Sequence, residues 1–491
     1  MRRRAAVAGM VAAVLAASPA KASPWAEPGD MALRNDIQIL VDHRVVRGPV
    51  TTWPISWRQL SDDLEARRGD SSLPAFVRRS LERVRARIGR ETARGRPRAG
   101  IDYRLTSSPD LWRTFDDTAR NDVDLRNRVE IMAGRFAGRL QANYRTAFGT
   151  SGRFDLDGSY VAAELGNWTV HVGAIERWWG PGRDGGLVLS TNARPVPAIG
   201  LARNRSTPFD LPVLRWLGPW RLALFVGQLE KDRTVSRPLL AGVRANIMPF
   251  ESLEIGVSRV AQLCGSGRPC GLDIWKKVLL GEDNIFELGF DQTKEPGNQL
   301  AGIDFRWAPR PFGMQIAFYG EIGAEDEAGG LPSKLIGLFG TELWGGSGPA
   351  GANWRLTAEY ADTAAGITRS EPLFNLAYEH TIYYNGYRYR DRALGYTLDN
   401  DGRFYSLNLF FVDARNKTYR LSLQRAEINR DGTGNNRVSG TKKDLLQVVA
   451  AVTVPFGRGR LQLAGRVNND GQADGSDELG AAIALRWTTG F

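Results

Sequence analysis

The last stretch of the chain, residues 478–491 (ELGAAIALRWTTGF), has the pattern that most constrains the fold. Ile483, Leu485 and Trp487 lie two residues apart, and the chain ends on the aromatic Phe491. A period of two places alternate side chains on opposite faces of a β-strand. In a transmembrane β-barrel the apolar face of such a strand meets lipid, and an aromatic residue lies at the membrane interface. The stretch therefore predicts a last strand that spans a membrane.

The same alternation continues through the chain from residue 101 onward. In a soluble β-sandwich the polar face of each strand would meet bulk water, whereas in a large barrel it lines a polar lumen. The mean hydropathy of −0.31 is consistent with a barrel, because only alternate residues of each strand face lipid. The clearest alternating sets are Trp220, Leu222, Leu224 and Val226; Leu356, Ala358 and Tyr360; Tyr419, Leu421 and Leu423; and Leu461, Leu463 and Val467.

The connections between these segments are alternately short and long. Short turns are expected near Gly134, Gly166, Pro249, 308–312, 413–417 and 455–459, and long loops at 106–122, 176–195, 262–298, 363–402, 428–443 and 469–477. Outer-membrane barrels have short periplasmic turns and long outer loops. If residues 196–203 form a strand and 363–402 a single excursion, every short turn falls on the inner side and the chain ends there. The sequence thus predicts a mostly β protein, a transmembrane antiparallel β-barrel of about 18 strands.

Residues 1–22 have the three parts of a secretory signal peptide. Arg2, Arg3 and Arg4 precede an apolar segment at 5–17, and residues 20–22 (AKA) form an A-x-A cleavage site. The apolar segment is shorter than the ~20 residues of a transmembrane helix, so cleavage is favoured over a retained anchor. The chain has a net charge of +11, and this segment contributes four of those charges. An exported basic protein is more consistent with an acidic glycan or lipid headgroup as partner than with nucleic acid.

Residues 23–99 have a helical pattern and are expected to form a small periplasmic domain, ending in a linker at 94–100, beside a barrel of residues 100–491. Asp30 precedes one apolar stripe, Ser56 begins an S-x-x-Q capping box, and Ser71 and Ser72 precede a third stripe. We expect three amphipathic helices that bury their stripes against one another or against the barrel end. The stripes are Leu33, Ile37, Leu40 and Val41; Leu60 and Leu64; and Val77, Leu81, Val84 and Ile88.

The two cysteines, Cys264 and Cys270, lie close together in the segment CGSGRPC. In an exported protein a disulfide is favoured over two free thiols. The chain has three histidines, so no ligand cluster of the usual spacing is present, and neither a metal nor another cofactor is expected.

The loop at 176–195 is a candidate polysaccharide-binding site on the outer side. Adjacent tryptophans beside Arg, Asp and Asn suit a sugar, because a flat ring covers the C–H face of a pyranose while guanidinium and amide groups bind hydroxyls or a uronate. The alternative is that the tryptophans pack in the barrel mouth or form an interfacial girdle. The candidate binding residues are Arg177, Trp178, Trp179, Asp184, Asn192 and Arg194.

The loop at 378–403 is a second candidate, because it is dense in tyrosine and arginine. Such a loop suits an acidic polysaccharide on the outer surface. Alternatively it folds inward and plugs the lumen, and the two roles are compatible. The candidate binding residues are Tyr383, Tyr387, Arg388, Tyr389 and Arg390.

Two other functions are alternatives for such a barrel. Lumen-facing arginines and glutamates would suit a channel for sugars or ions. A hydrolase site built from His171, Ser190 and Asp184 is the weaker alternative, because no G-x-S-x-G, H-E-x-x-H, Walker or G-x-G-x-x-G motif is present. The protein is therefore not expected to be an enzyme.

Seven segments, in order along the chain, resemble the Wzi-type capsule-assembly proteins of the Gram-negative outer membrane. They are residues 33–38 (LRNDIQ), 48–54 (GPVTTWP), 177–182 (RWWGPG), 192–195 (NARP), 216–220 (WLGPW), 264–270 (CGSGRPC) and 386–390 (GYRYR). The resemblance implies an outer-membrane barrel of about 18 strands with a periplasmic helical bundle. It also implies a lectin-like, non-catalytic role in attaching exported capsular polysaccharide or exopolysaccharide to the cell surface. The partners expected from this role are an acidic polysaccharide, outer-membrane lipid, and periplasmic export machinery contacted by the helical domain.

Overall fold

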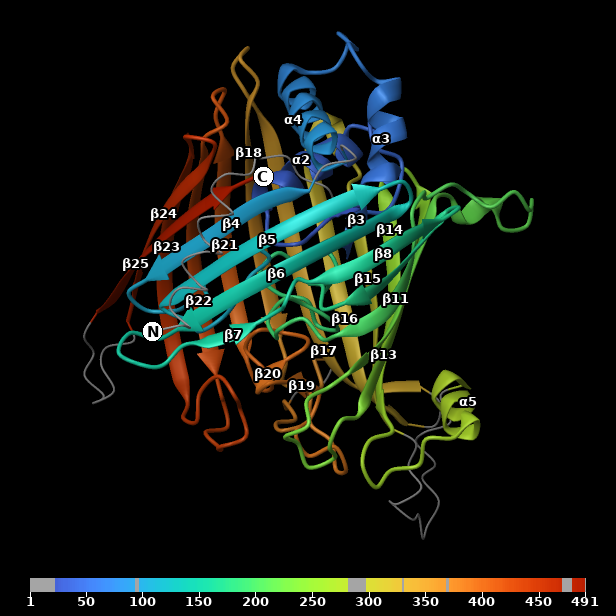
Figure 1. Cartoon of the computed structure of the whole chain (residues 1–491), viewed down its shortest axis with the longest axis vertical. Helices are drawn as coiled ribbons and strands as arrows, with labels where there is room; N and C mark the ends of the chain where they lie inside the picture. Colours follow the sequence, from blue (N-terminus) through green and yellow to red (C-terminus); the bar gives the residue numbers. More distant parts are fainter. Residues whose placement is uncertain are drawn as a thin grey trace.

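The computed structural model describes residues 23–92, 97–280, 297–328, 331–367, 371–469 and 479–490. The signal peptide predicted at 1–22 and the terminal Phe491 lie outside these ranges, as do parts of the loops at 262–298 and 469–477. The chain forms a β-barrel with three helices gathered at one end and long loops at the other (Figure 1). These two ends are called the helix end and the loop end.

The barrel wall is a closed antiparallel sheet of 18 strands, as predicted. β25 pairs with β4 and closes the barrel, with Trp487 opposite Tyr103. Two short segments, β7 and β8, both pair with β6 and share one position in the wall. The wall segments are β4 (Arg98–Thr106), β5 (Val123–Ala133), β6 (Phe136–Thr146), β7 (Arg153–Asp155), β8 (Tyr160–Leu165), β9 (Trp168–Gly173), β11 (Ala198–Arg203), β12 (Trp220–Gln228), β13 (Leu239–Phe250), β14 (Leu253–Leu263), β15 (Gly297–Trp307), β16 (Ile316–Ala328), β17 (Leu331–Ser347), β18 (Ala352–Asp362), β21 (Arg403–Val412), β22 (Thr418–Ile428), β23 (Lys443–Phe456), β24 (Gly459–Asn468) and β25 (Gly480–Thr489).

The predicted alternation separates a lipid-facing side of the wall from a polar lumen. Along β22, Leu421 and Leu423 are 51% and 46% exposed, whereas Ser422 and Gln424 beside them are buried. On the last strand, Ile483 is 65% exposed. Apolar side chains exposed on every second residue match an outer face in contact with hydrocarbon.

The three predicted helices are α2 (Met31–Asp42), α3 (Trp57–Ala66) and α4 (Ala75–Glu91), and α5 (Leu272–Leu280) lies in a loop-end connection. The side chain of Asp30 caps α2 by accepting a hydrogen bond from the Leu33 amide (3.0 Å). α4 begins after Pro74 and has no side-chain cap. No helix in the described ranges is long and apolar enough to cross a membrane.

The predicted capping box of α3 forms only in part. Ser56 accepts a hydrogen bond from the Arg58 amide (3.3 Å). Gln59, which would return the second bond of the box, donates instead to the Pro49 carbonyl (2.7 Å). A tertiary acceptor on the neighbouring loop therefore replaces the local one.

Short strand pairs connect the segments that lie inside the barrel. β1 (Trp25–Ala26) pairs with β3 (Ile55–Ser56), and β2 (Thr52–Trp53) pairs with β10 (Trp178–Trp179). β19 (Arg388–Tyr389) and β20 (Arg392–Ala393) form a hairpin.

Three details differ from the sequence prediction. The connection at 204–219 is long yet lies at the helix end, where only short turns were expected. β16, described as far as Ala328, pairs with β17, described from Leu331, although connections at the loop end were expected to be long. β4 already begins at Arg98, within the segment expected to be a linker.

Candidate functional site

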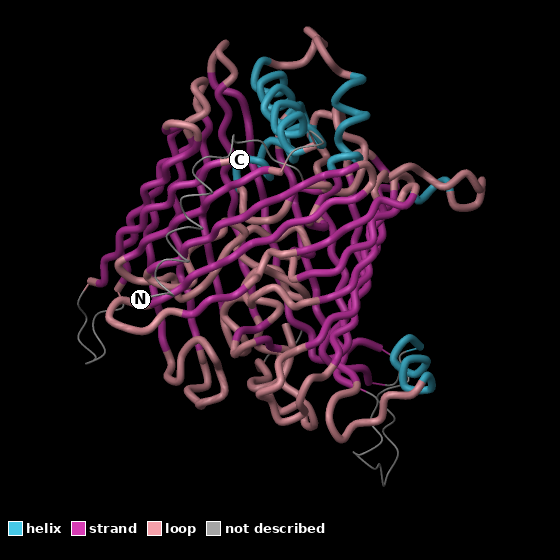
Figure 2. The backbone as a smooth tube through the Cα atoms, viewed as in Figure 1, coloured by secondary structure: helices cyan, strands magenta, loops and turns pink. Residues whose placement is uncertain are grey.

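Residues 176–195, predicted to lie exposed on the outer side, run inside the barrel instead. Trp178 and Trp179 pair with the amino-terminal segment, with Trp178 opposite Trp53. Trp178 is 0% exposed and Trp179 is 1% exposed. Figure 2 shows loop segments of this kind enclosed by the wall of strands. The expected surface position of this loop was wrong, and the alternative of tryptophans packed within the barrel is the one observed.

Aromatic and cationic side chains occupy the surroundings of these tryptophans. Phe115 lies edge-on to both Trp178 and Trp53, with ring centroids 5.2 Å and 5.1 Å away. The guanidinium carbon of Arg34 lies 4.3 Å from the centroid of Phe115. The tryptophans thus join the loop to the helical domain and are not exposed to a sugar at the surface.

The three residues of the alternative hydrolase site do not meet. Asp184 accepts a hydrogen bond from the Ser406 hydroxyl (2.5 Å), and burial raises the pKa of Asp184. The Nε2 atom of His171 contacts the guanidinium of Arg177 (3.3 Å), and burial lowers the pKa of Arg177 to about 10. Ser190 donates to the backbone carbonyl of residue 395 (2.5 Å). Each side chain has a separate structural partner, so no nucleophile–base pair forms.

The remaining polar candidates of this loop also bind within the protein. Asn192 donates to the Ala393 carbonyl at 2.9 Å and so contacts the β19–β20 hairpin. Arg194 binds the carboxylate of Asp157 at 2.6 Å. Both residues hold the loop in place inside the barrel.

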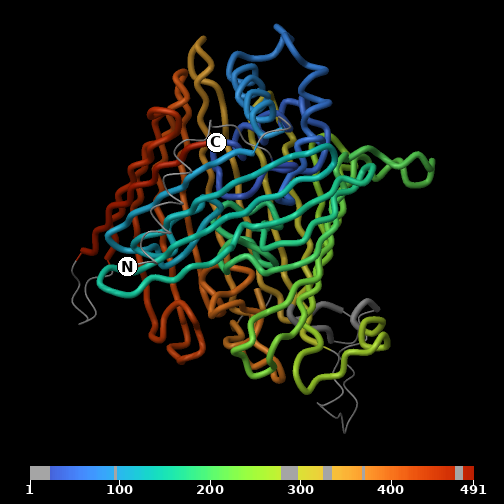
Figure 3. The backbone as a smooth tube through the Cα atoms, in the orientation of Figure 1, coloured from blue at the N-terminus to red at the C-terminus, as the bar shows by residue number. Residues whose placement is uncertain are grey.

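The second candidate loop also folds inward over most of its length. Tyr383, Tyr387, Arg388 and Tyr389 are at most 5% exposed, which corrects their expected surface position. Arg390 is exposed, as predicted, at the tip of the β19–β20 hairpin. Residues 176–195 and 371–402 together are called the plug (Figure 3).

The two parts of the plug are joined by tyrosine hydroxyls. Tyr387 donates to the Val188 carbonyl (2.9 Å), and Tyr378 donates to the Leu187 carbonyl (2.8 Å). These bonds satisfy buried backbone oxygens that have no neighbouring strand. The inward-plug alternative is therefore the arrangement of this loop.

The buried Arg388 forms ion pairs with two carboxylates of the second loop. Its Nε atom lies 2.9 Å from a carboxylate oxygen of Asp399, and its Nη2 atom binds Glu379. Burial alone would lower the pKa of Arg388, but the two carboxylates outweigh it and raise that pKa. Arg388 fixes the base of the hairpin whose tip carries Arg390.

Carboxylates on the barrel wall hold the plug through its backbone. Glu321 on β16 accepts from the amides of Leu187 (3.0 Å) and Val188 (3.1 Å). Glu359 on β18 accepts from the amides of Arg183 (2.7 Å) and Asp184 (3.0 Å). Each glutamate satisfies two buried backbone amides of the plug, so these two side chains attach the plug to the wall.

Hydrogen bonds from backbone amides to a wall glutamate also hold the helical domain at the helix end. Glu254 on β14 accepts from the amides of Val50 (2.9 Å) and Thr51 (3.0 Å). Arg306 on β15 binds Asp42 at the end of α2 (2.7 Å). The two ends of this segment, Asp42 and Val50–Thr51, are thereby fixed to the barrel wall.

Sequence reasoning missed these wall glutamates. Glu254, Glu321 and Glu359 are single polar residues on the lumen face of a strand, like many others that alternate with apolar residues. Their partners are amides more than 100 residues away, and a backbone amide has no signature in the sequence.

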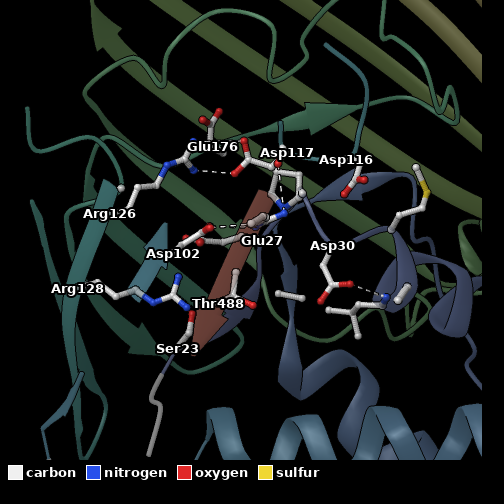
Figure 4. A pocket seen from close by; sticks show the side chains of 18 of the residues that line it. Ser23, Glu27, Asp30, Asp102, Asp116, Asp117, Arg126, Arg128, Glu176 and Thr488 are labelled. Carbon is white, nitrogen blue, oxygen red and sulfur yellow. Dashed lines mark hydrogen bonds and ion pairs between the residues drawn. The ribbon is translucent and has the colours of Figure 1, made fainter. Parts of the chain in front are cut away.

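A cavity of about 180 Å³ remains between the amino-terminal segment and the wall. Figure 4 shows carboxylates and guanidiniums directed toward this space from the wall, the loops and the amino-terminal segment. Arg126 binds Asp117 (2.6 Å), and Asp102 binds Arg486 (2.9 Å). Burial raises the pKa of Glu176. The charged groups lining the cavity include Glu27, Asp30, Asp102, Asp116, Asp117, Glu176, Arg126, Arg128 and Arg486.

These lining groups do not form a metal centre. In the described ranges, no group of three or more His, Cys, Asp or Glu side chains is arranged to hold a metal ion. The cavity residues come from both ends of the chain, so no local sequence pattern could bring them together in a prediction.

The exposed surface of the loop end is built on the plug. Tyr384 is 64% exposed, and the neighbouring Asn385 accepts from the Thr234 amide (2.9 Å). The exposed Arg437 has its amide fixed to Asp399 (2.8 Å), the partner of Arg388. Tyr384, Arg390 and Arg437 are exposed residues of the loop end.

A disulfide lies next to this surface. Cys264 and Cys270 are bonded, with their Cα atoms 4.8 Å apart. The hydroxyl of Tyr383 donates to the Cys264 carbonyl (3.1 Å). The disulfide loop is thereby attached to the residue that precedes Tyr384.

Comparison with known proteins places this barrel in a family. The sequence profile of the family described as "Capsule assembly protein Wzi" matches residues 103–476. The chain belongs to the Wzi capsule assembly family. Membership agrees with the resemblance found from the sequence, and it makes the protein an outer-membrane capsule-assembly barrel and not an enzyme.

Two individual relatives are similar over most of their length. An uncharacterized 55.8 kDa protein in the cps region of Klebsiella pneumoniae is 31% identical over 405 residues, which cover 82% of this chain and 77% of the relative. The solved structure of Wzi from Escherichia coli is 26% identical with a TM-score of 0.80, covering 94% of this chain and 98% of that one. That protein is described as an outer-membrane protein involved in group 1 capsule assembly and as a carbohydrate-binding β-barrel.

Proposed function

We propose that the protein binds an acidic capsular polysaccharide or exopolysaccharide at the loop end and attaches it to the cell surface. In this proposal the loop end faces outward, the helix end lies in the periplasm, and residues 1–22 are removed as a signal peptide. Long loops at one end and mostly short turns at the other support this orientation. The description of the E. coli relative as a carbohydrate-binding β-barrel supports the ligand class.

The observation that carries the proposal is the exposure of Tyr384 and Arg390 on a surface that the buried plug residues hold in place. An exposed tyrosine ring can cover the C–H face of a sugar, and a guanidinium can pair with a uronate. Arg388 and Tyr387 hold the hairpin and the plug in one arrangement. Binding to such a surface loses little conformational entropy.

The eleven residues named from the sequence divide into two roles in this proposal. Arg390 contacts the glycan, together with Tyr384 and Arg437, which the sequence prediction did not include. The other ten candidates, nine of them buried and Arg194 half-buried, position the plug beneath this surface. Their substitution would change the shape of the loop end and would not remove a direct contact.

The test is binding of purified acidic capsular polysaccharide to the full mature protein in detergent. We expect Tyr384→Ala to weaken binding by up to about tenfold, because one aromatic contact contributes about 0.5–1.5 kcal/mol. We expect Arg390→Ala to weaken binding most at low salt, because salt screens exposed charges.

Arg79→Ala is the matched control, because Arg79 is an exposed arginine on α4 at the opposite end of the barrel. It should bind the polysaccharide as the wild type does. Equal affinity of the wild type and both loop-end variants, or equal loss in the control, would contradict the proposal.

A further inference from the structure

The connection between β11 and β12 is unlike the other turns of the helix end. Residues 204–219, here called the side loop, include the sequence TPFDLPVLRWLGP at 207–219. Figure 1 shows this green loop leaving the wall sideways, away from the barrel. Neither the helical domain nor the plug accounts for such a projection.

The base of the side loop is firmly attached. The guanidinium carbon of Arg203 lies 3.8 Å from the centroid of Trp220, and the rings of Phe209 and Trp220 stack with centroids 4.5 Å apart. Arg205 binds Asp62 of α3 at 2.7 Å. The direction of the loop is therefore fixed by contacts at its base.

The tip of the side loop is apolar and exposed. Leu211 is 63% exposed, Val213 is 80% exposed and Trp216 is 66% exposed. Three large apolar side chains exposed on one loop indicate a surface that contacts a membrane or another protein. The tip carries two charged residues of opposite sign, Asp210 and Arg215, so charge does not select its partner.

The side loop continues the lipid-facing surface of the barrel. It joins two wall strands, and Ile199 on the outer face of β11 is 54% exposed. Other aromatic residues are exposed at the same end of the wall. They are Phe136 at 51%, Phe250 at 66%, Phe312 at 101% and Phe456 at 57%. Such a ring of aromatic residues marks the level at which a barrel meets the lipid headgroups.

We propose that the side loop is a membrane anchor that inserts Leu211, Val213 and Trp216 into the phospholipid headgroup layer at the helix end. Its apolar tip, single tryptophan and sideways direction fit the interface, where Trp is enriched and apolar side chains enter the acyl boundary. The assignment of this layer to the periplasmic leaflet rests on the orientation in the proposed function. The anchor fixes one side of the barrel relative to the membrane plane.

The test is the depth of a nitroxide spin label in vesicles of phosphatidylethanolamine and phosphatidylglycerol. Labels are placed on Val213→Cys, on Ile199→Cys as the acyl-chain reference and on Arg79→Cys as the aqueous reference. The two native cysteines form a disulfide, so without reductant only the introduced thiol reacts. The ratio of collision rates with oxygen and with a water-soluble nickel complex reports depth.

We expect the ratio at Val213 to lie between the two references. A ratio equal to that at Arg79 would place the loop in water and overturn the proposal. Loss of collisions with both reagents, with spin–spin broadening, would show a second protein copy on the loop and overturn it as well. Glycan binding is measured at the opposite end, so either result leaves the polysaccharide proposal standing.

Discussion

Two aspartates in the plug, two residues apart, have opposite electrostatic surroundings. Asp399 is paired with the guanidinium of Arg388, whereas Asp401 makes no ion pair within the described part of the chain. Asp401 accepts instead from the amide of Asn375 (3.0 Å). Burial, with Asp431 and Asp399 nearby, raises the pKa of Asp401 to about 7. The ionised form of Asp401 is therefore disfavoured in the folded plug.

This difference gives a prediction for pH. A carboxyl whose pKa is higher in the folded state binds more protons there than in the unfolded state, so its contribution to stability falls as pH rises. The loss should develop between about pH 4, the unfolded pKa, and about pH 7, the folded pKa. We expect Asp401→Asn to stabilise the plug relative to wild type above pH 7 and to have little effect at pH 4. Hydrogen exchange of residues 371–402, compared between variant and wild type at each pH, measures this.

Asp399→Asn is the control, because it removes the partner of a buried arginine. Breaking a buried ion pair by removing one member costs about 3–5 kcal/mol. This variant should loosen the same segment at every pH. The same response to pH in both variants would contradict the assignment of the effect to Asp401.

At the scale of elements, the sequence predicts the wall well and the interior poorly. The alternation of apolar and polar residues, as around Leu421 and Leu463, shows which side chains face lipid and which face the lumen. That information is enough to predict a closed sheet. It says nothing about whether a long polar loop stays outside. The pairing of Trp178 with Trp53 joins residues 125 positions apart, and the sequence around each tryptophan is consistent with a surface site as well as with packing.

The attachment of the helical domain to the wall gives a prediction for one element. Glu254→Ala leaves the amides of Val50 and Thr51 without their acceptor in a buried place. Each unsatisfied buried group costs about 1–3 kcal/mol, so residues 49–53 should detach more readily from the wall. We expect faster limited proteolysis of the helical domain in detergent, followed by mass spectrometry.

Glu251→Ala is matched to this variant, because Glu251 joins the same end of the wall to the helical domain. It binds Arg44 at 3.0 Å, but both side chains are more than 60% exposed. Exposed ion pairs contribute about 0–1 kcal/mol, so this variant should be cleaved like wild type. Equal cleavage of the two variants would show that burial of the Glu254 bonds does not hold the domain.

At the scale of the whole molecule, the lumen is closed by two parts of the chain that enter from opposite ends. The plug enters from the loop end, and residues 42–53 with α2 enter from the helix end. They meet where β2 pairs with β10 inside the barrel. Buried side chains of both parts, among them Tyr378 and Trp178 of the plug and Trp53 of the amino-terminal segment, belong to the hydrophobic clusters that fill this interior. A channel for sugars or ions would need a path through both parts.

This double closure predicts how the protein behaves in a planar lipid bilayer. The full mature protein should give no conductance steps of porin size, because polar groups in the lumen are bound to the plug and to the helical domain. Replacing residues 378–398 by a short Gly-Ser linker should leave it silent, since the helix end remains closed. Removing residues 23–92 and replacing residues 176–195, the other part of the plug, by such a linker as well should open the lumen and give porin-sized steps. Circular dichroism checks that each variant keeps its strand content, so that silence is not mistaken for loss of the barrel. Porin-sized steps from the full protein would contradict the closure and favour the channel alternative.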